Sequence, residues 1–203
     1  MAQNGAAART SRIARTTSET KVAVELGLDG AGEAQVATGV GFFDHMLTAF
    51  ARHGLFDLRV KVEGDLHIDA HHTVEDTGIA LGQAFWEALG DKRGIVRIAD
   101  ACAPLDEALV HAVVDLSGRA YLAHDLVLSG PAIGAFDTQL GEEFWRAFAH
   151  NARLTLHVRQ LAGRNDHHIV EAAFKAVARA LDAASRRDPR VVGVPSTKGT
   201  LDV

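Results

Sequence analysis

A cassette of two adjacent histidines and a carboxylate occurs twice in this sequence. The two copies are His71, His72 and Glu75, and His167, His168 and Glu171. On a helix, residues four apart lie on one face, so the first histidine and the glutamate of each copy could chelate one ion. Imidazole and carboxylate ligands suit Mn, Fe, Ni or Zn, and the lack of thiolate ligands argues against a closed structural zinc site. The cassettes predict a two-metal site.

The second histidine of each cassette needs a separate role. His72 and His168 point about 100° away from their neighbours on a helix, so they cannot join the same chelate. The economical arrangement is a crossed one, in which two helix starts face each other and each second histidine reaches the ion of the other helix. The alternative is that the histidine pairs cap helices or lie exposed, and two matched copies favour the metal site.

The duplication extends beyond the cassettes. At a constant offset of 98, residues 44–51 align with residues 142–149, and the offset falls to 96 at the histidine pairs. We therefore predict an α+β fold that is a tandem duplication of a β-β-α-β-α unit of roughly 90 residues. The first unit is expected over residues 9–94 and the second over 95–190. Residues 1–8 are expected to be a disordered tail, and residues 191–203 a separate C-terminal tail.

Hydrophobic periodicity gives the expected elements of each unit. Helices are predicted over residues 42–53, 73–89, 141–151 and 169–185. Residues 21–28 and 34–38 are predicted to form a hairpin, and residues 108–115 and 119–128 the matching hairpin. Single strands are predicted over residues 55–62 and 153–160.

Composition narrows the class of protein. The chain has 203 residues, 47% hydrophobic, and a formal net charge of −5, so it can bury a sizeable core and has no general attraction to nucleic acid. Its one cysteine, Cys102, excludes an internal disulfide framework and fits a reducing compartment. No apolar run approaches membrane-spanning length, and the start lacks a signal peptide's hydrophobic stretch. We expect a cytoplasmic protein with no membrane partner.

Several long motifs, in order, resemble one family. They span Gly41–Leu47, His53–Leu58, His71–Asp76, Arg159–His168 and Pro195–Gly199. Together they are similar to imidazoleglycerol-phosphate dehydratase of histidine biosynthesis. The resemblance implies helices packed between two mostly antiparallel sheets, in a fold like the second domain of a ribosomal protein. It also implies a homo-oligomer, of 24 subunits built from trimers.

The resemblance implies two Mn²⁺ ions per active site, at a subunit interface. One ion would be held by His45, His72, His167 and Glu171, and the other by His71, Glu75, Glu143 and His168. Some family members have histidine at position 143, where this chain has a glutamate. A carboxylate oxygen can still bind manganese. The alternative is that water takes that place and Glu143 is a carboxylate on a helix surface.

The implied reaction converts D-erythro-imidazoleglycerol phosphate to imidazoleacetol phosphate and water. The hydrogen that leaves lies on a carbon with no adjacent carbonyl, so the ring must supply the electrons. With metal at both ring nitrogens, the imidazolate can expel the hydroxyl to give a diazafulvene-like intermediate. The resemblance assigns Glu19 as the acid/base shuttle, acting with metal-bound water. The catalytic set that the resemblance implies is Glu19, His45, His71, Glu75, His168 and Glu171.

The phosphorylated substrate needs cations and donors away from the metals. The residues that match the family's substrate contacts are Glu19, His53, Arg97, Arg119, Lys175, Ser196, Thr197 and Lys198. Without the resemblance, Arg97 could be a surface charge, Arg119 a turn residue and Lys198 part of a disordered tail. Because a tail with no hydrophobic anchor would ordinarily be disordered, we expect bound phosphate to order it.

Two other classes of function remain open from the residues alone. A two-metal hydrolase could use a metal-bridging hydroxide, although no separate leaving-group site is evident. A metal-binding scaffold protein would need neither Glu19 nor a phosphate-binding set.

Overall fold

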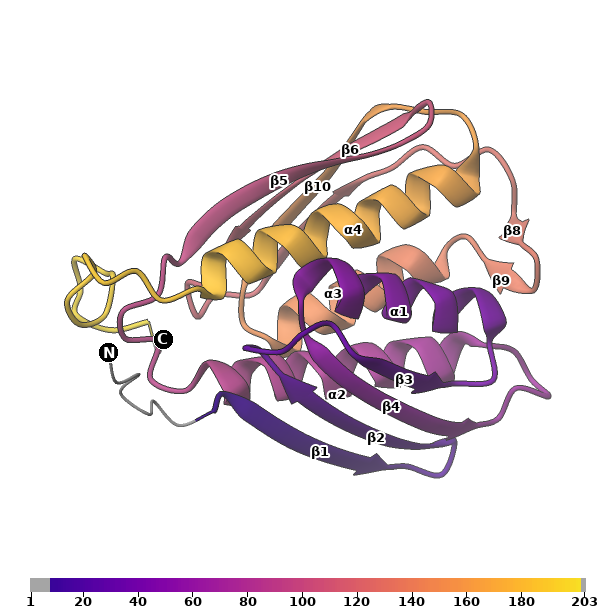
Figure 1. Ribbon diagram of the computed structural model, residues 1–203. Coiled ribbons are helices and arrows are strands. Elements are labelled where there is room, and N and C mark those ends of the chain that lie inside the picture. The colour runs from indigo at the N-terminus through magenta and orange to yellow at the C-terminus, as the bar shows by residue number, and fades with distance from the viewer. Residues whose placement is uncertain (1–7, 202–203) are drawn as a thin grey trace.

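The computed structural model describes residues 8–201. The predicted disordered start, residues 1–8, lies outside the described residues except for Ala8. Two sheets enclose a layer of helices (Figure 1), which confirms the predicted α+β class. The helices are α1 (Gly41–Gly54), α2 (His71–Leu89), α3 (Leu140–Asn151) and α4 (Asp166–Ser185).

The two sheets have the same topology, as expected of a duplication. The first contains β1 (Thr10–Thr16), β2 (Thr20–Gly27), β3 (Ala34–Ala37) and β4 (Asp57–Gly64), in the order β1-β2-β4-β3. The second contains β5 (Ile98–Leu105), β6 (Ala108–Asp115), β7 (Tyr121–Asp125) and β10 (Thr155–Ala162), in the order β5-β6-β10-β7. A small ribbon of β8 (Ala132–Ile133) and β9 (Phe136–Asp137) precedes α3.

The predicted hairpins are wrong in their pairing. The strands at residues 21–28 and 34–38 exist, but β3 pairs in parallel with β4, and β2 forms its hairpin with β1. In the second unit β7 likewise pairs in parallel with β10, while β6 pairs with β5. Each four-stranded sheet therefore contains one strand more than predicted, and the second unit also has the β8–β9 ribbon. Alternation identifies a strand but does not identify its partner, because partner choice depends on contacts distant in sequence.

The inward faces of both sheets and the helices share one core. Along β2, Val22, Val24 and Leu26 alternate inward, as a strand with one solvent face requires. At the centre, the Phe144 ring lies 5.3 Å from Phe174 and 5.2 Å from Phe43, measured between centroids. Since Phe43 comes from the first unit, the aromatic cluster joins the two units. Burial of each such side chain stabilises the fold by about 1.5–3 kcal/mol.

Two glycines allow α2 and α3 to lie close together. A Cβ atom on Gly78 would be 2.8 Å from the Phe144 carbonyl oxygen, and one on Gly82 would be 2.6 Å from that of Phe148. Any side chain at these two positions would push the helices apart. The spacing of four residues places both glycines on one face of α2.

All four helices begin at the same end of the helix layer, on the right of Figure 1, whereas the C-terminal tail lies at the opposite end. Both histidine cassettes thereby come to one end of the molecule, at the starts of α2 and α4. Among the described helices, none combines the length and apolar character needed to cross a membrane.

Candidate active site

The cassette of α4 forms part of a convergent three-ligand cluster. His167 and Glu171 lie four residues apart on α4, and the His167 Nε2 atom is 3.2 Å from Glu171 Oε2. His45, from α1, places its Nε2 atom 3.1 Å from the same oxygen. One ligand atom from each of the three residues lies within 4.8 Å of the other two. Two imidazole nitrogens and one carboxylate fit a first-row divalent metal.

A neighbouring lysine keeps the cluster's carboxylate ionised. Lys175 Nζ lies 2.6 Å from Glu171 Oε1. Burial by itself raises the pKa of Glu171, but hydrogen bonds from Lys175 and His45 outweigh it and lower that pKa to about 2. Burial, together with the charges of Lys175 and Arg179, lowers the pKa of His53. His53 and Lys175, both predicted substrate contacts, therefore border this cluster.

The cassette of α2 is more open. His71 Nε2 lies 3.7 Å from Glu75 Oε2, and both side chains are exposed to solvent over almost half their surface. Glu143, from α3, lines the same cavity as His71, with a volume of about 500 Å³. The Glu143 carboxylate is 3.6 Å from Arg146 Nη1. The structure thus brings Glu143 to the side of the cavity where a ligand was predicted. Within residues 8–201, only the α4 cluster meets the criterion of three converging ligands.

The second histidines do not cross over within one chain. His72 Nδ1 is 2.9 Å from Asp65 Oδ2, and His168 Nδ1 is 2.8 Å from Glu107 Oε2. A carboxylate at Nδ1 holds the proton there, which leaves Nε2 as an acceptor for a metal. The hydrogen bond raises the pKa of His72, while that from His168 is the main reason why the pKa of Glu107 falls to about 2.

Sequence reasoning missed Asp65 and Glu107. Asp65 follows the end of β4, and Glu107 lies in the turn between β5 and β6. The sequence gives only a weak sign of their role, because carboxylates are common in turns of all proteins. Only the pairing of each with a cassette histidine marks them as part of the site.

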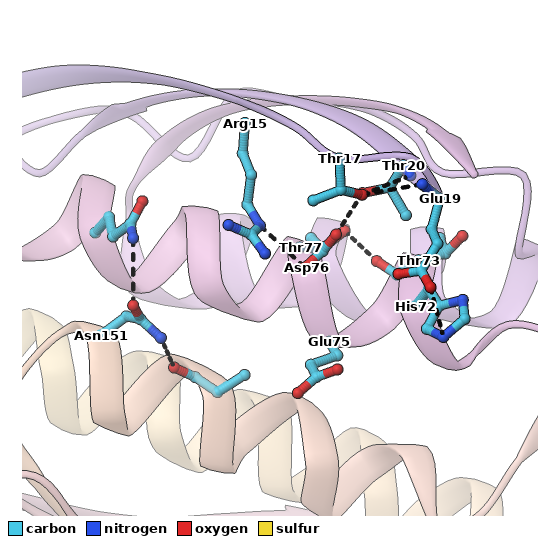
Figure 2. Close-up of polar contacts among 12 residues, drawn as sticks. Arg15, Thr17, Glu19, Thr20, His72, Thr73, Glu75, Asp76, Thr77 and Asn151 are labelled. Carbon is cyan, nitrogen blue, oxygen red and sulfur yellow. Dashed lines mark hydrogen bonds and ion pairs between the residues drawn. The ribbon is translucent and has the colours of Figure 1, made fainter. Parts of the chain in front are cut away.

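Glu19 lies at the edge of the α2 cassette. It is exposed in the turn between β1 and β2, with Oε1 3.7 Å from His72 Nε2 (Figure 2). The structure therefore brings the predicted proton shuttle to a predicted metal ligand. His72 lies between Asp65 on one ring nitrogen and Glu19 on the other.

The predicted phosphate set lies elsewhere in the chain. The Arg97 guanidinium binds Asp115 through two hydrogen bonds, of 2.8 and 3.1 Å, and donates a third to the Pro195 carbonyl at 2.8 Å. Arg97 thus holds the C-terminal tail. Ser196 Oγ accepts from the backbone N–H of Lys198, and the side chains of Thr197 and Lys198 are exposed.

Arg97 has a backbone conformation that is uncommon outside glycine. Its φ is +77°, in the left-handed region, where a residue with a Cβ is typically disfavoured by about 1–2 kcal/mol. Hydrogen bonds hold it there: its N–H donates to the Ala184 carbonyl, and its carbonyl accepts from Leu116. The loop that begins at Leu116 continues to Arg119, which is exposed. The two arginines are therefore on neighbouring segments.

The length of α4 separates the two halves of the predicted site. His167 is at the start of this helix and Ala184, which holds Arg97, is near its end. At a rise of about 1.5 Å per residue, these positions are about 25 Å apart. A small phosphorylated substrate cannot bridge that distance. Within a single chain, the phosphate set and the α4 metal cluster cannot serve one substrate molecule.

Comparison with known proteins identifies the family. A family model described as imidazoleglycerol-phosphate dehydratase matches residues 38–181. The imidazoleglycerol-phosphate dehydratase of Gluconacetobacter diazotrophicus is 63% identical over 195 residues, which cover 96% of this chain and 98% of that protein. The corresponding protein of Thermobifida fusca is 60% identical over 195 residues, or 95% of this chain and 99% of that protein.

A solved structure agrees with the sequence relatives. The crystal structure of imidazoleglycerol-phosphate dehydratase from Staphylococcus aureus superposes with a TM-score of 0.80 at 41% identity, covering 88% of this chain and 99% of that chain. The resemblance of the sequence motifs is confirmed. The chain belongs to the imidazoleglycerol-phosphate dehydratase family, whose members are hydro-lyases.

Proposed function

We propose that this protein removes water from D-erythro-imidazoleglycerol phosphate to give imidazoleacetol phosphate, in the cytoplasm, as a step of histidine biosynthesis. Family membership supports the reaction. The observation that supports the site most directly is the convergence of His45, His167 and Glu171 on one point. This cluster provides the ligand types that a manganese ion requires.

The proposed site holds two Mn²⁺ ions. His45, His167 and Glu171 would hold the first with His72, and His71, Glu75 and Glu143 would hold the second with His168. Both second histidines turn Nε2 away from the carboxylate that holds their Nδ1, which leaves that nitrogen available to a metal. When bound, the ions would stabilise the imidazolate form of the substrate ring, as the diazafulvene-like route requires.

The chain's own groups would perform the remaining tasks. The hydroxyl would leave the carbon attached to the ring, and Glu19 would then take the proton from the adjacent carbon. Hydrogen and hydroxyl would thus be lost as water, and the resulting enol would become a ketone. Arg97 and Arg119, with Ser196, Thr197 and Lys198 of the tail, would bind the phosphate. His53 and Lys175 would contact the substrate beside Glu171.

We also propose that the active site forms between copies of the chain. The separation of Arg97 from His167 along α4 supports this, because the two must meet on one substrate. The proposed assembly is a homo-oligomer of 24 subunits built from trimers. Metal ligands that come from two subunits would make the assembly depend on metal.

The deciding experiment is a dehydration assay on protein stripped of metal and then supplied with Mn²⁺. We expect imidazoleacetol phosphate to form only after Mn²⁺ is added, and His167→Ala to abolish that response. His150→Ala is the matched control, because His150 is an exposed histidine in the last turn of α3. Equal turnover with and without verified metal removal would contradict the two-metal proposal.

Light scattering on the same samples tests the assembly. Chelation is expected to release smaller particles, trimers on the proposed arrangement. A large particle that persists after metal removal would count against interfacial ions.

A further inference from the structure

The first turns of α2 present two faces with different tasks. His71 and Glu75 lie on one face. His72 and Asp76, also four residues apart, lie toward the β1–β2 hairpin, on the side away from Glu75 (Figure 2). Asp76 is only 6% exposed. A buried carboxylate is costly unless it is paired and hydrogen-bonded. Its partners therefore indicate what this residue does.

Asp76 binds both strands of the hairpin that contains Glu19. Thr20, the first residue of β2 and 2% exposed, donates its hydroxyl to Asp76 Oδ2. Arg15, near the end of β1, donates Nε–H to Asp76 Oδ1 at 3.0 Å. One carboxylate on α2 thus holds the chain on each side of the turn.

The turn itself is organised around Thr17. Its hydroxyl oxygen accepts from the backbone N–H groups of Glu19 and Thr20, at 3.1 and 3.0 Å. Its own N–H donates to the Thr20 carbonyl at 2.9 Å. Thr20 is therefore the link between the anchor on α2 and the backbone of Glu19. With this link in place, the Glu19 carboxylate stands 3.7 Å from His72 Nε2.

The second unit shows that packing does not require a carboxylate at this position. At the offset of 96 that aligns the cassettes, Ala172 of α4 corresponds to Asp76. Ala172 is fully buried. In that unit Glu107 bonds its histidine directly. Of these two equivalent helix positions, only that of α2, which lies beside the Glu19 turn, has a buried carboxylate.

We propose that Asp76, acting through Thr20, is a positioning residue that holds Glu19 at the distance from the substrate that proton transfer needs. The proposal rests on the proposed dehydratase function and on Glu19 as its proton shuttle. Proton transfer requires heavy atoms about 2.6–3.2 Å apart, and a misplacement of about 1 Å can cost about a hundredfold in rate. Loss of the hydrogen bond between Thr20 and Asp76 lets the turn move, while His71 and Glu75 on the other face of α2 stay in place.

The central variant is Thr20→Val, which removes the hydroxyl and keeps the shape of the side chain. We expect kcat to fall about tenfold to a hundredfold, with KM and manganese content unchanged. Thr20→Ser restores the hydroxyl and should return kcat to near the parent value. Asp76→Asn should lower kcat in the same direction as Thr20→Val. Loss of manganese from Thr20→Val, or a kcat equal to the parent's, would overturn the proposal.

Ser11→Ala is the matched control. The Ser11 hydroxyl donates to the Ala84 carbonyl at 2.7 Å, so it also joins β1 to α2, but far from the turn. This variant loses a hydrogen bond of the same kind and should keep the parent kcat. An equal fall in kcat for Ser11→Ala would show that any loosening of the hairpin is sufficient, which would overturn a specific role for Asp76.

A double-mutant cycle separates positioning from general support of the fold. In the Glu19→Gln background, Thr20→Val should cause no further loss of kcat, because the group that it positions can no longer carry the proton. Losses that multiply would show that Thr20 and Asp76 act on something else. A Glu19→Gln variant with full activity would also overturn the proposal, since nothing would remain to be positioned.

Hydrogen–deuterium exchange gives a readout that does not depend on activity. The peptide over residues 16–21 should exchange faster in Thr20→Val than in the parent, and at the parent rate in Ser11→Ala. Unchanged exchange in Thr20→Val would overturn the anchor while leaving the proposed function intact. A parent protein with metal that turns over no substrate would overturn the proposed function, and the positioning role with it.

Discussion

The two units of the chain contain the same cassette, and they differ in how they complete it. In the second unit, His167 and Glu171 are joined by His45 from the first unit. In the first unit the equivalent pair stands further apart, at 3.7 Å, and its cavity is lined by Glu143. At the offset of 98, His45 and Glu143 occupy equivalent positions of α1 and α3. Each unit therefore receives its additional candidate ligand from the other unit.

The two units differ more in the carboxylates around their second histidines, His72 and His168, than in their chelating pairs. Glu19 and Glu107 lie in equivalent turns, between the first two strands of their units. In the second unit the turn carboxylate, Glu107, holds His168 at Nδ1. In the first unit Asp65, which is not in the turn, holds His72 in the same way. At the offset of 98 the position equivalent to Asp65 is Gly163, which has no side chain to do this. Because Asp65 orients the ring in the first unit, Glu19 is not needed for that task. The duplication thereby leaves the Glu19 carboxylate available for the proton transfer that we propose for it.

The largest expected effect comes from the two chelating carboxylates. Glu171→Gln and Glu75→Gln should each lose chiefly one of the two ions per subunit. Loss of an outer-shell partner alone typically costs about 10–100-fold, so activity should fall by more than about a hundredfold in either variant. Elemental analysis checks the metal content. If both variants keep both ions at full occupancy, Glu75 and Glu171 do not each hold one ion, and the two-site arrangement is refuted.

The next test compares the two turn carboxylates. Glu19→Gln should keep both ions and the assembly while kcat falls on the order of 10²–10⁴-fold, because the amide cannot carry the proton. Glu107→Gln should instead weaken metal binding by about 10–100-fold, because it orients His168. Metal titration and steady-state kinetics on both variants distinguish these roles. A loss of metal in Glu19→Gln would show that Glu19 and Glu107 have the same role in metal binding.

A smaller effect is expected at the opposite end of α4. Arg97→Ala would remove the proposed charge-assisted contact with phosphate and should weaken substrate binding by about 1.5–3 kcal/mol with metal retained. The measurement is the affinity for substrate by calorimetry. Arg12→Ala is the control, since Arg12 is largely exposed and pairs with Glu25 on the sheet. Equal affinity in the parent and in Arg97→Ala would remove Arg97 from the site.

The smallest effect concerns stability. At the offset of 96, α4 has Phe174 and Ala178 where α2 has Gly78 and Gly82. Gly82→Ala would place a Cβ atom 2.6 Å from the Phe148 carbonyl, so the free energy of unfolding should fall by about 1–3 kcal/mol. Denaturant unfolding measures this. Gly141→Ala, at a helical position with open space around the Cβ, is the control and should not destabilise the fold.

The sequence was more informative about helices and ligand pairs than about strand partners. Helical spacing depends on neighbouring residues, so the i, i+4 contact of His167 with Glu171 was predictable. The strand β1 was missed because it alternates between exposed and half-buried residues at a sheet edge, with a weak hydrophobic signal. The parallel pairing of β3 with β4 crosses over α1, and no local pattern encodes such a contact.

The site was predictable only in part for the same reason. The predicted metal ligands lie in the first turns of the helices, and Glu19 lies in the turn beside them. The proposed crossing of His72 and His168 is not made within the chain. The separation of Arg97 from His167 follows from the length and direction of α4 and from the placement of the tail. These are properties of the whole fold rather than of any motif.

The separation along α4 also has a genetic consequence. On the proposed assembly, the phosphate-binding end of one copy works with the metal end of another. A chain altered at Arg97 would bind substrate weakly and a chain altered at His167 would lack a metal ligand, yet when they are co-expressed some sites would combine the intact end of each. Such pairs of alleles would complement one another, whereas two alleles altered at the same end of α4 would not.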